Sequence, residues 1–307
     1  MTRRSRHVVA LTTVLAASCT LVDPLGGLTG GASPGSDATT CEGSCGEVDA
    51  MSDGQPDSFS PMPEAAVDAG HEAARDATGE AAVDAGSVYA AAVLADTPLA
   101  YWRLGDAPTS GSCHDATGNG NDATVVGGVS LGVPGALLND SDTAVHFDGS
   151  TAVLQAGSKF DFAGTVPLTI ELWAKPDMLN AGYGHLEGKM LYNDAGQPYD
   201  GIYMYVHTGT TLGFERWGNG SIDLALSSTS VAVGSWWHIV GTYSSGVASL
   251  YVNGALADTG PTAVSVTANT VSFQMGDLFQ GSLDEVALYG SALSAPRILA
   301  HYQASGR

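Results

Sequence analysis

Residues 201–207 read Gly-Ile-Tyr-Met-Tyr-Val-His, and this stretch decides the fold. Successive side chains of a β-strand point to opposite faces of the sheet. A strand at this position therefore places its aliphatic residues on one face and its tyrosines and histidine on the other. The first face holds Ile202, Met204 and Val206, and the second holds Tyr203, Tyr205 and His207.

The next segment, Thr211–Trp217, repeats this alternation. Leu212 and Phe214 share one face, and Glu215 and Trp217 share the opposite face. The two segments predict a pair of strands with an aliphatic inside and an aromatic, polar outside. Such an outside has two interpretations. It is either a platform for sugars, whose rings have apolar faces that stack on aromatic side chains, or an amphipathic cover for the sheet.

Short β-like runs separated by Gly, Asn, Asp and Pro continue on both sides of this pair. Many short strands with regular turn signals indicate an all-β sandwich or barrel. Helices are expected only at the two ends, at Tyr89–Ala95 and after the N-cap Ser294, where Ile298, Leu299 and Tyr302 form an apolar face. The other predicted strands are Ala100–Leu104, Ala123–Val126, Ala144–Phe147, Ala152–Leu154, Leu168–Lys175, Trp236–Tyr243, Ala248–Val252, Ser272–Met275 and Leu283–Tyr289.

The charge balance narrows the classes of partner. The 307 residues include 11 basic and 32 acidic side chains, which gives a formal net charge of −21. Proteins that bind nucleic acid neutralise phosphates with clusters of Lys and Arg, and this chain has no such clusters. The composition therefore excludes nucleic acid as a partner and suits an exported protein with many oxygens for hard cations.

Residues 1–18 have the pattern of a targeting segment. Basic residues precede the apolar run Val8–Ala17, which is shorter than the roughly 20 residues of a membrane span. Small residues and then Cys19 follow. This arrangement resembles the signal of bacterial lipoproteins, which implies that Cys19 is acylated and becomes the mature N-terminus. Thr20, in place of Asp, then favours the outer membrane or cell surface. A plain secretory signal is the alternative.

Residues 19–86 form a region of a different kind. They are dominated by Ala, Gly, Asp, Glu, Ser and Pro, and the heptapeptide Glu-Ala-Ala-Val-Asp-Ala-Gly occurs twice, at Glu64–Gly70 and Glu80–Gly86. Low hydrophobicity with many like charges does not offset the entropy lost on ordering. We expect a disordered acidic tether that extends by self-repulsion and holds the following domain away from a membrane.

The remaining cysteines are Cys41, Cys45 and Cys113. Export permits disulfides, and Cys41 and Cys45 are spaced to close a small loop. Zinc binding by that pair is the less favoured interpretation, because no second Cys or His pair accompanies it. Cys113 is then left single, and an intermolecular link through it stays open.

Ordered motifs run from Ser87 to Ala304. They are Val93–Asp106, Asp115–Asp122, Pro134–Leu137, Ala144–Ser150, Leu168–Trp173, Trp236–Val240, Ser249–Gly254, Gly281–Tyr289, Ala292–Ser294 and His301–Tyr302. The set resembles the bacterial laminin-G-like, concanavalin A-like lectin/glucanase domain. The resemblance implies a jelly-roll sandwich of two antiparallel sheets over residues 87–307. Because this fold hosts lectins, adhesion modules and hydrolases, it does not by itself give an activity.

The resemblance also implies a structural calcium ion. In such domains the loop that reads Asp-Ala-Thr-Gly-Asn-Gly-Asn at 115–121 often holds Ca²⁺. Asp115 is the best candidate ligand, and Asn119, Asn121 and Asp284 are possible further ligands together with backbone carbonyls. The alternative is a Gly-Asn turn whose side chains accept hydrogen bonds from the backbone.

No arrangement of acids in the sequence predicts catalysis. Glycoside hydrolysis needs a pair of carboxyl groups about 5–10 Å apart. Glu171 is alone on its strand, Glu215 has no strand partner within two residues, and the adjacent Asp284 and Glu285 point to opposite faces. Motifs for serine hydrolases, zinc proteases and phosphate loops are also missing. We therefore expect that the protein is not an enzyme.

The sequence thus predicts a lipid-anchored, extracytoplasmic binding module. Its partner is expected to be carbohydrate, or a glycosylated or protein partner, and its contact with the membrane is expected only through the N-terminal lipid. A hydrolase or lyase with a non-standard carboxylate site and a purely structural adhesion domain are the alternatives. The candidate ligand-binding residues are Tyr203, Tyr205, Trp217, Glu215 and Asn253.

Overall fold

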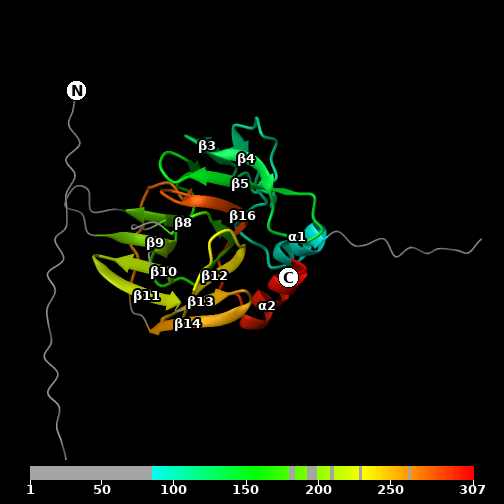
Figure 1. The fold of residues 1–307 in the computed structure, drawn as a ribbon. Coiled ribbons are helices and arrows are strands. Elements are labelled where there is room, and N and C mark those ends of the chain that lie inside the picture. The colour runs from blue at the N-terminus through cyan, green and yellow to red at the C-terminus, as the bar shows by residue number, and fades with distance from the viewer. Residues whose placement is uncertain (1–84, 180–183, 192–198, 208–210, 228–229, 262–263) are drawn as a thin grey trace, which may run out of the picture. The chain divides into compact units, whose positions relative to one another are not determined.

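The structure is a computed structural model that describes residues 85–307, apart from 180–183, 192–198, 208–210, 228–229 and 262–263 (Figure 1). The predicted signal segment and the predicted Cys19, Cys41 and Cys45 sites lie outside the described residues. Within the described residues, no helix is both long and apolar enough to cross a membrane.

The described domain is a sandwich of two sheets in which all neighbouring strands are antiparallel. The first sheet has the order β14-β13-β12-β7-β16-β5-β4, and β1 also pairs with β16. Its strands are β1 (Ala100–Trp102), β4 (Ser130–Pro134), β5 (Thr143–Asp148), β7 (Leu168–Pro176), β12 (Trp237–Ser244), β13 (Val247–Val252), β14 (Ala255–Pro261) and β16 (Gln280–Tyr289).

The second sheet has the order β11-β10-β9-β8-β15-β6-β3-β2. Its strands are β2 (Ser112–Cys113), β3 (Ala123–Val126), β6 (Val153–Gln155), β8 (Gly184–Leu191), β9 (Asp200–His207), β10 (Thr211–Gly218), β11 (Ser221–Ser227) and β15 (Gln274–Met275). Every strand predicted from the sequence is present, and β2, β4, β8, β11 and β14 are additional. The expected jelly-roll sandwich is confirmed.

The main core fills the space between the two sheets. Ile202 and Met204 of β9 and Phe214 of β10 are fully buried there, as the alternation predicted, and they face apolar residues of the first sheet such as Leu172 and Ile239. Burying one such side chain stabilises the fold by about 1.5–3 kcal/mol. This packing fixes which side chains of β9 and β10 point outward.

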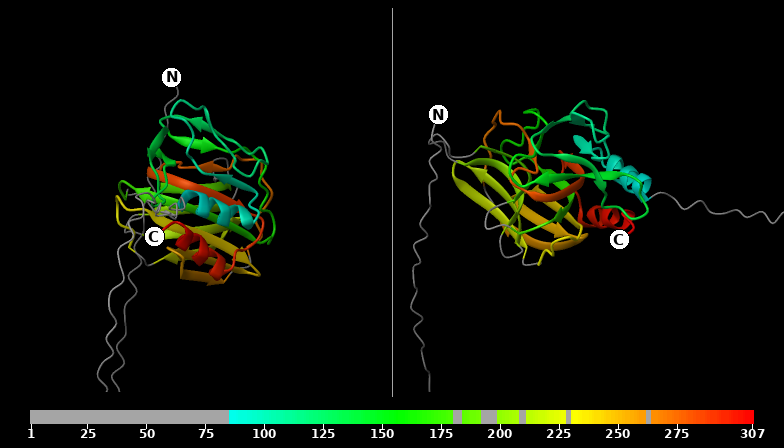
Figure 2. Two further views of the ribbon diagram at one scale, coloured as in Figure 1. Left: turned by 90° about the vertical axis from the view of Figure 1, so that its right-hand side faces the viewer. Right: turned by 45° about the horizontal axis from the view of Figure 1, so that its top comes forward.

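Two helices, α1 (Ala85–Ala95) and α2 (Ala295–Ala304), lie side by side over the outer face of the first sheet (Figure 2). A second, smaller core lies beneath them and contains Tyr89, Trp173 and Ile298. The predicted apolar face of α2 is only partly correct. Leu299 is 42% exposed, and His301 is the residue that lies buried against the sheet beside Ile298.

Candidate functional site

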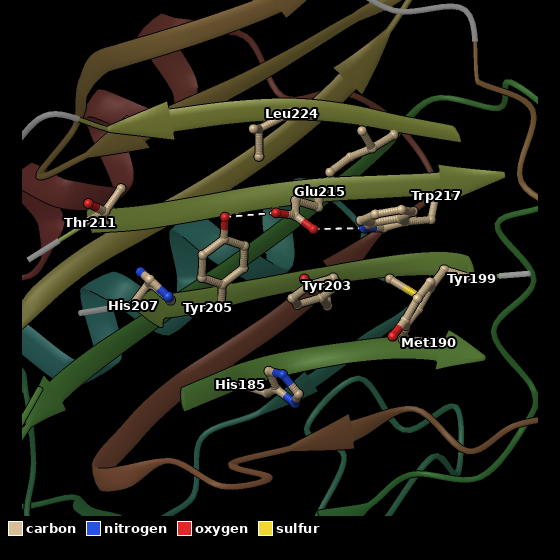
Figure 3. Close-up of a pocket in the computed structure, with 11 residues that line it drawn as sticks. His185, Met190, Tyr199, Tyr203, Tyr205, His207, Thr211, Glu215, Trp217 and Leu224 are labelled. Carbon is tan, nitrogen blue, oxygen red and sulfur yellow. Dashed lines mark hydrogen bonds between the residues drawn. The ribbon is translucent and has the colours of Figure 1, made fainter. Parts of the chain in front are cut away.

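The outer face of the second sheet is hollowed over strands β8 to β11 (Figure 3). The hollow has a volume of about 630 Å³. It is lined by side chains that alternate along the strands with the core residues. The described lining residues are His185, Met190, Tyr199, Tyr203, Tyr205, His207, Thr211, Glu215, Trp217, Ile222 and Leu224. Four of the five ligand-binding residues predicted from the sequence thus lie around one cavity.

Glu215 is 4% exposed and is held by two of the aromatic residues. The hydroxyl of Tyr205 donates a hydrogen bond to Oε1 at 2.7 Å, and the indole Nε1 of Trp217 donates to Oε2 at 2.7 Å (Figure 3). An ionised carboxylate has about four acceptor positions. Each oxygen of Glu215 therefore retains the capacity to accept a hydrogen bond from a further donor.

The position of Tyr205 depends on a glycine in the neighbouring strand. Gly213 of β10 is the register partner of Tyr205. A Cβ atom at residue 213 would lie only 2.2 Å from Cζ of the tyrosine ring. Since glycine has no Cβ, the ring can lie across β10 and bring its hydroxyl to Glu215. This close approach explains why a glycine interrupts an otherwise bulky strand.

Aromatic rings surround the carboxylate on both sides. The ring centroids of Tyr203 and Tyr205 are 5.2 Å apart with an interplanar angle of 34°, and those of Tyr199 and Trp217 are 5.2 Å apart with an angle of 47°. Tyr199 is 40% exposed, so part of this aromatic surface is open to solvent. Apolar ring faces next to a hydrogen-bonding carboxylate suit a ligand that has both an apolar face and hydroxyl groups.

Glu215 is the single carboxylic acid among the described residues that line the hollow. Glu171, Asp284 and Glu285, the other acids considered from the sequence, do not line the hollow, and Glu171 lies under the helices on the outer face of the first sheet. Hydrolysis of a glycoside needs two carboxyl groups on either side of the bond that breaks. The described lining residues therefore do not supply the acid pair of a glycosidase.

Asn253, the fifth predicted ligand residue, does not line the hollow, and its role in ligand binding stays a prediction. It occupies the turn between β13 and β14 with a positive φ of 50°. Its side-chain Oδ1 accepts a hydrogen bond from the backbone N of His238 at 3.0 Å. An Asn-Gly pair is favoured in tight turns because both residues tolerate positive φ. The structure thus uses Asn253 to close a hairpin of the first sheet.

The loop that begins at Asp115 is closed by hydrogen bonds. Oδ1 of Asp115 accepts from the backbone N of Tyr101 and from both the N and Oγ1 of Thr117, and Oδ2 accepts from the N of Asn121. Burial acts to raise the pKa of Asp115, but these hydrogen bonds lower it below its usual value. Donors therefore fill the positions that a cation would need.

The other predicted calcium ligands are also engaged in hydrogen bonds. The side-chain amides of Asn119 and Asn121 donate to the carbonyl of Leu99, and Asp284 accepts from the backbone N of Ala136. The amide hydrogen bonds hold Asn119 and Asn121 in the turn, and Lys159 Nζ lies 3.4 Å from Oδ1 of Asn121, so the residues as arranged fit the turn rather than the cation. Calcium binding at this loop stays a prediction.

Three acids do meet beside Asp284, but a guanidinium group lies between them. Arg103 contacts Asp140 at 3.1 Å, Asp142 at 2.7 Å and Glu285 at 3.4 Å. Tyr101 also donates a hydrogen bond to Glu285. Burial raises the pKa of Glu285 to about 8, although Arg103 and Tyr101 act in the opposite direction. The positive charge that this cluster requires is supplied by the protein itself.

Cys113 is fully buried and is not paired within the described residues. Burial, with the nearby Asp106, raises the pKa of the thiol to about 12. A buried thiol that stays protonated is poorly placed to form a link to a second molecule. The intermolecular disulfide that the sequence left open is therefore disfavoured.

A buried network around Glu171 was not predicted from the sequence. The carboxylate accepts hydrogen bonds from the hydroxyls of Tyr89 at 3.0 Å and Tyr289 at 2.9 Å, and it contacts His238 Nε2 at 2.8 Å and His301 Nδ1 at 3.0 Å. Burial acts to raise the pKa of Glu171, but the hydrogen bonds and charges of the two histidines lower it below its usual range. All of its acceptor positions are occupied.

His301 connects this network to helix α1. Its Nε2 lies 3.0 Å from Oδ2 of Asp96 and 3.1 Å from the carbonyl oxygen of Ala92, while Nδ1 faces Glu171. Both ring nitrogens face acceptors, which favours the doubly protonated, charged imidazole, although Nη2 of Arg297 also lies 3.4 Å from Nε2. Burial acts to lower the pKa of His301, but the bonds to Glu171 and the charge of Asp96 raise it.

Comparison with known families and structures agrees with the fold. A model of the Laminin_G_3 family, described as the concanavalin A-like lectin/glucanases superfamily, matches residues 148–299. This match includes the strands that carry the hollow, and it supports the expected laminin-G-like domain. No curated protein matches this chain.

Three solved structures have a similar fold. The binding domain of Paraclostridial Mosquitocidal Protein 1 has 17% sequence identity and a TM-score of 0.54, with 68% of this chain covered. The binding domain of botulinum neurotoxin serotype D has 13% identity and a TM-score of 0.53, with 69% covered. The binding domain of botulinum neurotoxin DC in complex with SialylT has 14% identity and a TM-score of 0.51, with 68% covered.

The matched part spans about half of these structures, since 52% of each is covered. At such low identity the likeness shows the fold alone. All three are binding domains of other proteins.

Proposed function

We propose that this protein is a lipid-anchored, extracytoplasmic binding module that recognises carbohydrate in the hollow over β8 to β11, without catalysis. The observation that supports this most is the pairing of Glu215 with Tyr205 and Trp217. It holds a nearly buried carboxylate in one orientation next to open aromatic surface.

A sugar uses both features of such a site. The C–H face of a pyranose ring stacks on an aromatic ring, here Trp217 or Tyr199, and its hydroxyls donate to a fixed acceptor, here Glu215. Because the carboxylate is already oriented by two donors, little side-chain entropy is lost when the ligand binds. The matched toxin domains support a binding role, and the lack of a second acid among the described lining residues supports binding without hydrolysis.

A glycan array probed with the full-length chain tests this function. We expect a subset of glycans to bind, and we expect Trp217→Ala to weaken their binding by about tenfold or more, the loss typical of a central aromatic contact. Trp236→Ala is the matched control. Trp236 directly precedes β12 of the first sheet, with Lys175 Nζ 5.2 Å from its ring centroid, and it does not line the hollow.

An array on which no glycan binds would contradict carbohydrate recognition. Equal losses from the two tryptophan substitutions would place the binding surface elsewhere. A glycan that is cleaved during incubation would favour the hydrolase alternative.

The proposal for the anchor depends on residues outside the described part of the chain. Cys19 follows a short apolar run and small residues, as in lipoprotein signals. Expression in a bacterium with two membranes, followed by mass spectrometry of the mature N-terminus, should find Cys19 with acyl chains and the protein in the outer-membrane fraction. Cys19→Ala should release the chain from that fraction. An unmodified, soluble mature chain would indicate a plain secretory signal.

A further inference from the structure

On the strands that form the hollow, the Lys and Arg side chains point away from it. β8 to β11 carry two basic residues, Lys189 and Arg216, and both are buried on the inner side. Nζ of Lys189 donates to the carbonyl oxygen of Ser158 at 3.0 Å. The guanidinium of Arg216 contacts Asp223 at 3.3 Å and the carbonyl of Gly164 at 2.9 Å. Neither cation faces a ligand in the hollow.

The remaining cations of residues 85–307 are bound elsewhere. Their partners are acids, carbonyls or an indole ring outside the hollow, and none of these cations lines it. The segments of this region that the structure does not describe contain no Lys or Arg in their sequence. The remaining cations are Arg103, Lys159, Lys175, Arg297 and Arg307.

The fixed charge in the described lining is therefore negative. It belongs to Glu215, whose carboxylate is shielded from water by its neighbours. A charge in such a place interacts more strongly with a nearby ion than a fully solvated one does. Proteins that bind carboxylate or sulfate groups supply Arg or Lys for them, often in bidentate contacts. The net charge of −21 adds a long-range repulsion of anions.

We propose that the hollow selects uncharged sugar rings and rejects anionic ones, such as uronates and sialylated or sulfated glycans. This inference rests on the proposed carbohydrate-binding function and adds its specificity. Glu215 acts twice: it accepts hydroxyl groups of neutral sugars, and it repels carboxylate and sulfate groups. His185 and His207 also line the hollow.

The test is an array of neutral oligosaccharides, each paired with its sialylated, sulfated or uronate counterpart, probed with the full-length chain at pH 8. Neutral members should bind, and their anionic counterparts should bind at least about tenfold more weakly. Anionic members that bind as well as or better than their neutral counterparts would overturn the inference and leave carbohydrate binding in place. An array without any binding would overturn the proposed function itself.

Two variants show whether Glu215 is the cause. Glu215→Gln keeps the shape of the side chain and removes the charge, so the ratio of anionic to neutral binding should rise by about tenfold. Thr211→Lys adds a cation to the lining and should raise the same ratio. Asp177→Asn is the control, because it removes one negative charge next to His146, outside the hollow. An equal change of the ratio in Asp177→Asn and Glu215→Gln would show that only the net charge matters.

Discussion

The two outer faces of the sandwich each place a glutamate on an inner strand, and they use it in opposite ways. On the first sheet, Glu171 lies beneath α1 and α2 and accepts from two tyrosines and two histidines. On the second sheet, Glu215 accepts from one tyrosine and one tryptophan and lies beside open aromatic surface.

The number of donors around each carboxylate accounts for the difference. With four donors, the acceptor positions of Glu171 are filled, and the residue can only hold the structure together. With two donors, Glu215 is oriented but not saturated, so it remains available to a ligand. We infer that the first face is a structural closure, which fixes the helices to the sheet, and that the second face is the binding surface.

The largest expected effect on stability comes from breaking the buried network around Glu171. Glu171→Gln leaves two buried histidines and two tyrosine hydroxyls opposite an amide that cannot satisfy them. Loss of one partner from a buried charged network costs about 3–5 kcal/mol. Urea denaturation should show a loss of this size, whereas Glu215→Gln, at the open face, should cost about 1 kcal/mol. Similar losses for the two variants would contradict the distinction between the faces.

Another buried glutamate, Glu187, sharpens the comparison because no donor among the described residues contacts it. It lies on β8, fully buried, and neither of its oxygens has a hydrogen-bond partner among the described residues. Burial raises its pKa well above the ordinary value of 4.5, so the folded chain holds this proton more tightly than the unfolded chain does. The unfolded chain releases that proton above pH 4.5, so stability falls as the pH rises past this value.

Glu187→Gln removes this dependence. Between pH 5 and 7, the stability of the natural chain should fall relative to the variant by up to about 1.4 kcal/mol for each pH unit. Chemical denaturation of both chains across this range measures the slope. Parallel curves would mean that Glu187 has a partner in solution.

His301 gives a smaller dependence at higher pH. Its folded pKa is raised above the ordinary value of 6.5 by Glu171 and Asp96, against burial and the nearby Arg297. Its contribution to stability is fully present below about pH 6.5 and is lost as the pH rises through the folded pKa. We expect a loss of about 1 kcal/mol between pH 6 and 9 relative to His301→Gln. A difference that grows in the opposite direction would show that His301 is neutral in the fold.

The smallest effect is expected at the Asp115 loop. Asp115, like Glu171, accepts four hydrogen bonds and is closed to a ligand. Millimolar Ca²⁺ or a chelator should therefore change the Tm of the full chain by less than about 1 °C. A Tm that rises with Ca²⁺ and falls with chelator would show that calcium displaces these bonds, as the family resemblance implied.

The sequence predicted the part of the site that lies on β9 and β10, because an unbroken alternation of apolar and aromatic residues fixes both the strand and its faces. It did not predict β8 and β11, which line the hollow on either side of this pair. β8 contains two glycines and two charged residues, and its Glu187 and Lys189 are buried against the usual preference of such residues. The pattern that identifies a strand is therefore missing there, although β8 contributes His185 and Met190 to the hollow.

The buried network around Glu171 could not be predicted from the sequence, for a different reason. Glu171 and His301 are 130 residues apart, and Glu171 and Tyr89 are 82 residues apart. No periodicity along the chain relates such positions, because only the packing of α1 and α2 on the sheet brings them together. The same holds for Asn253, because an Asn-Gly pair is typical of a turn but does not give the sheet to which that turn belongs.

A crystal structure of the full chain with a bound neutral glycan tests the central claim most directly. The account predicts a sugar ring against Trp217 or Tyr199, with a hydroxyl oxygen about 3 Å from a carboxylate oxygen of Glu215. A glycan bound over the helices or beside Asn253, with the hollow over β8 to β11 left open, would contradict it.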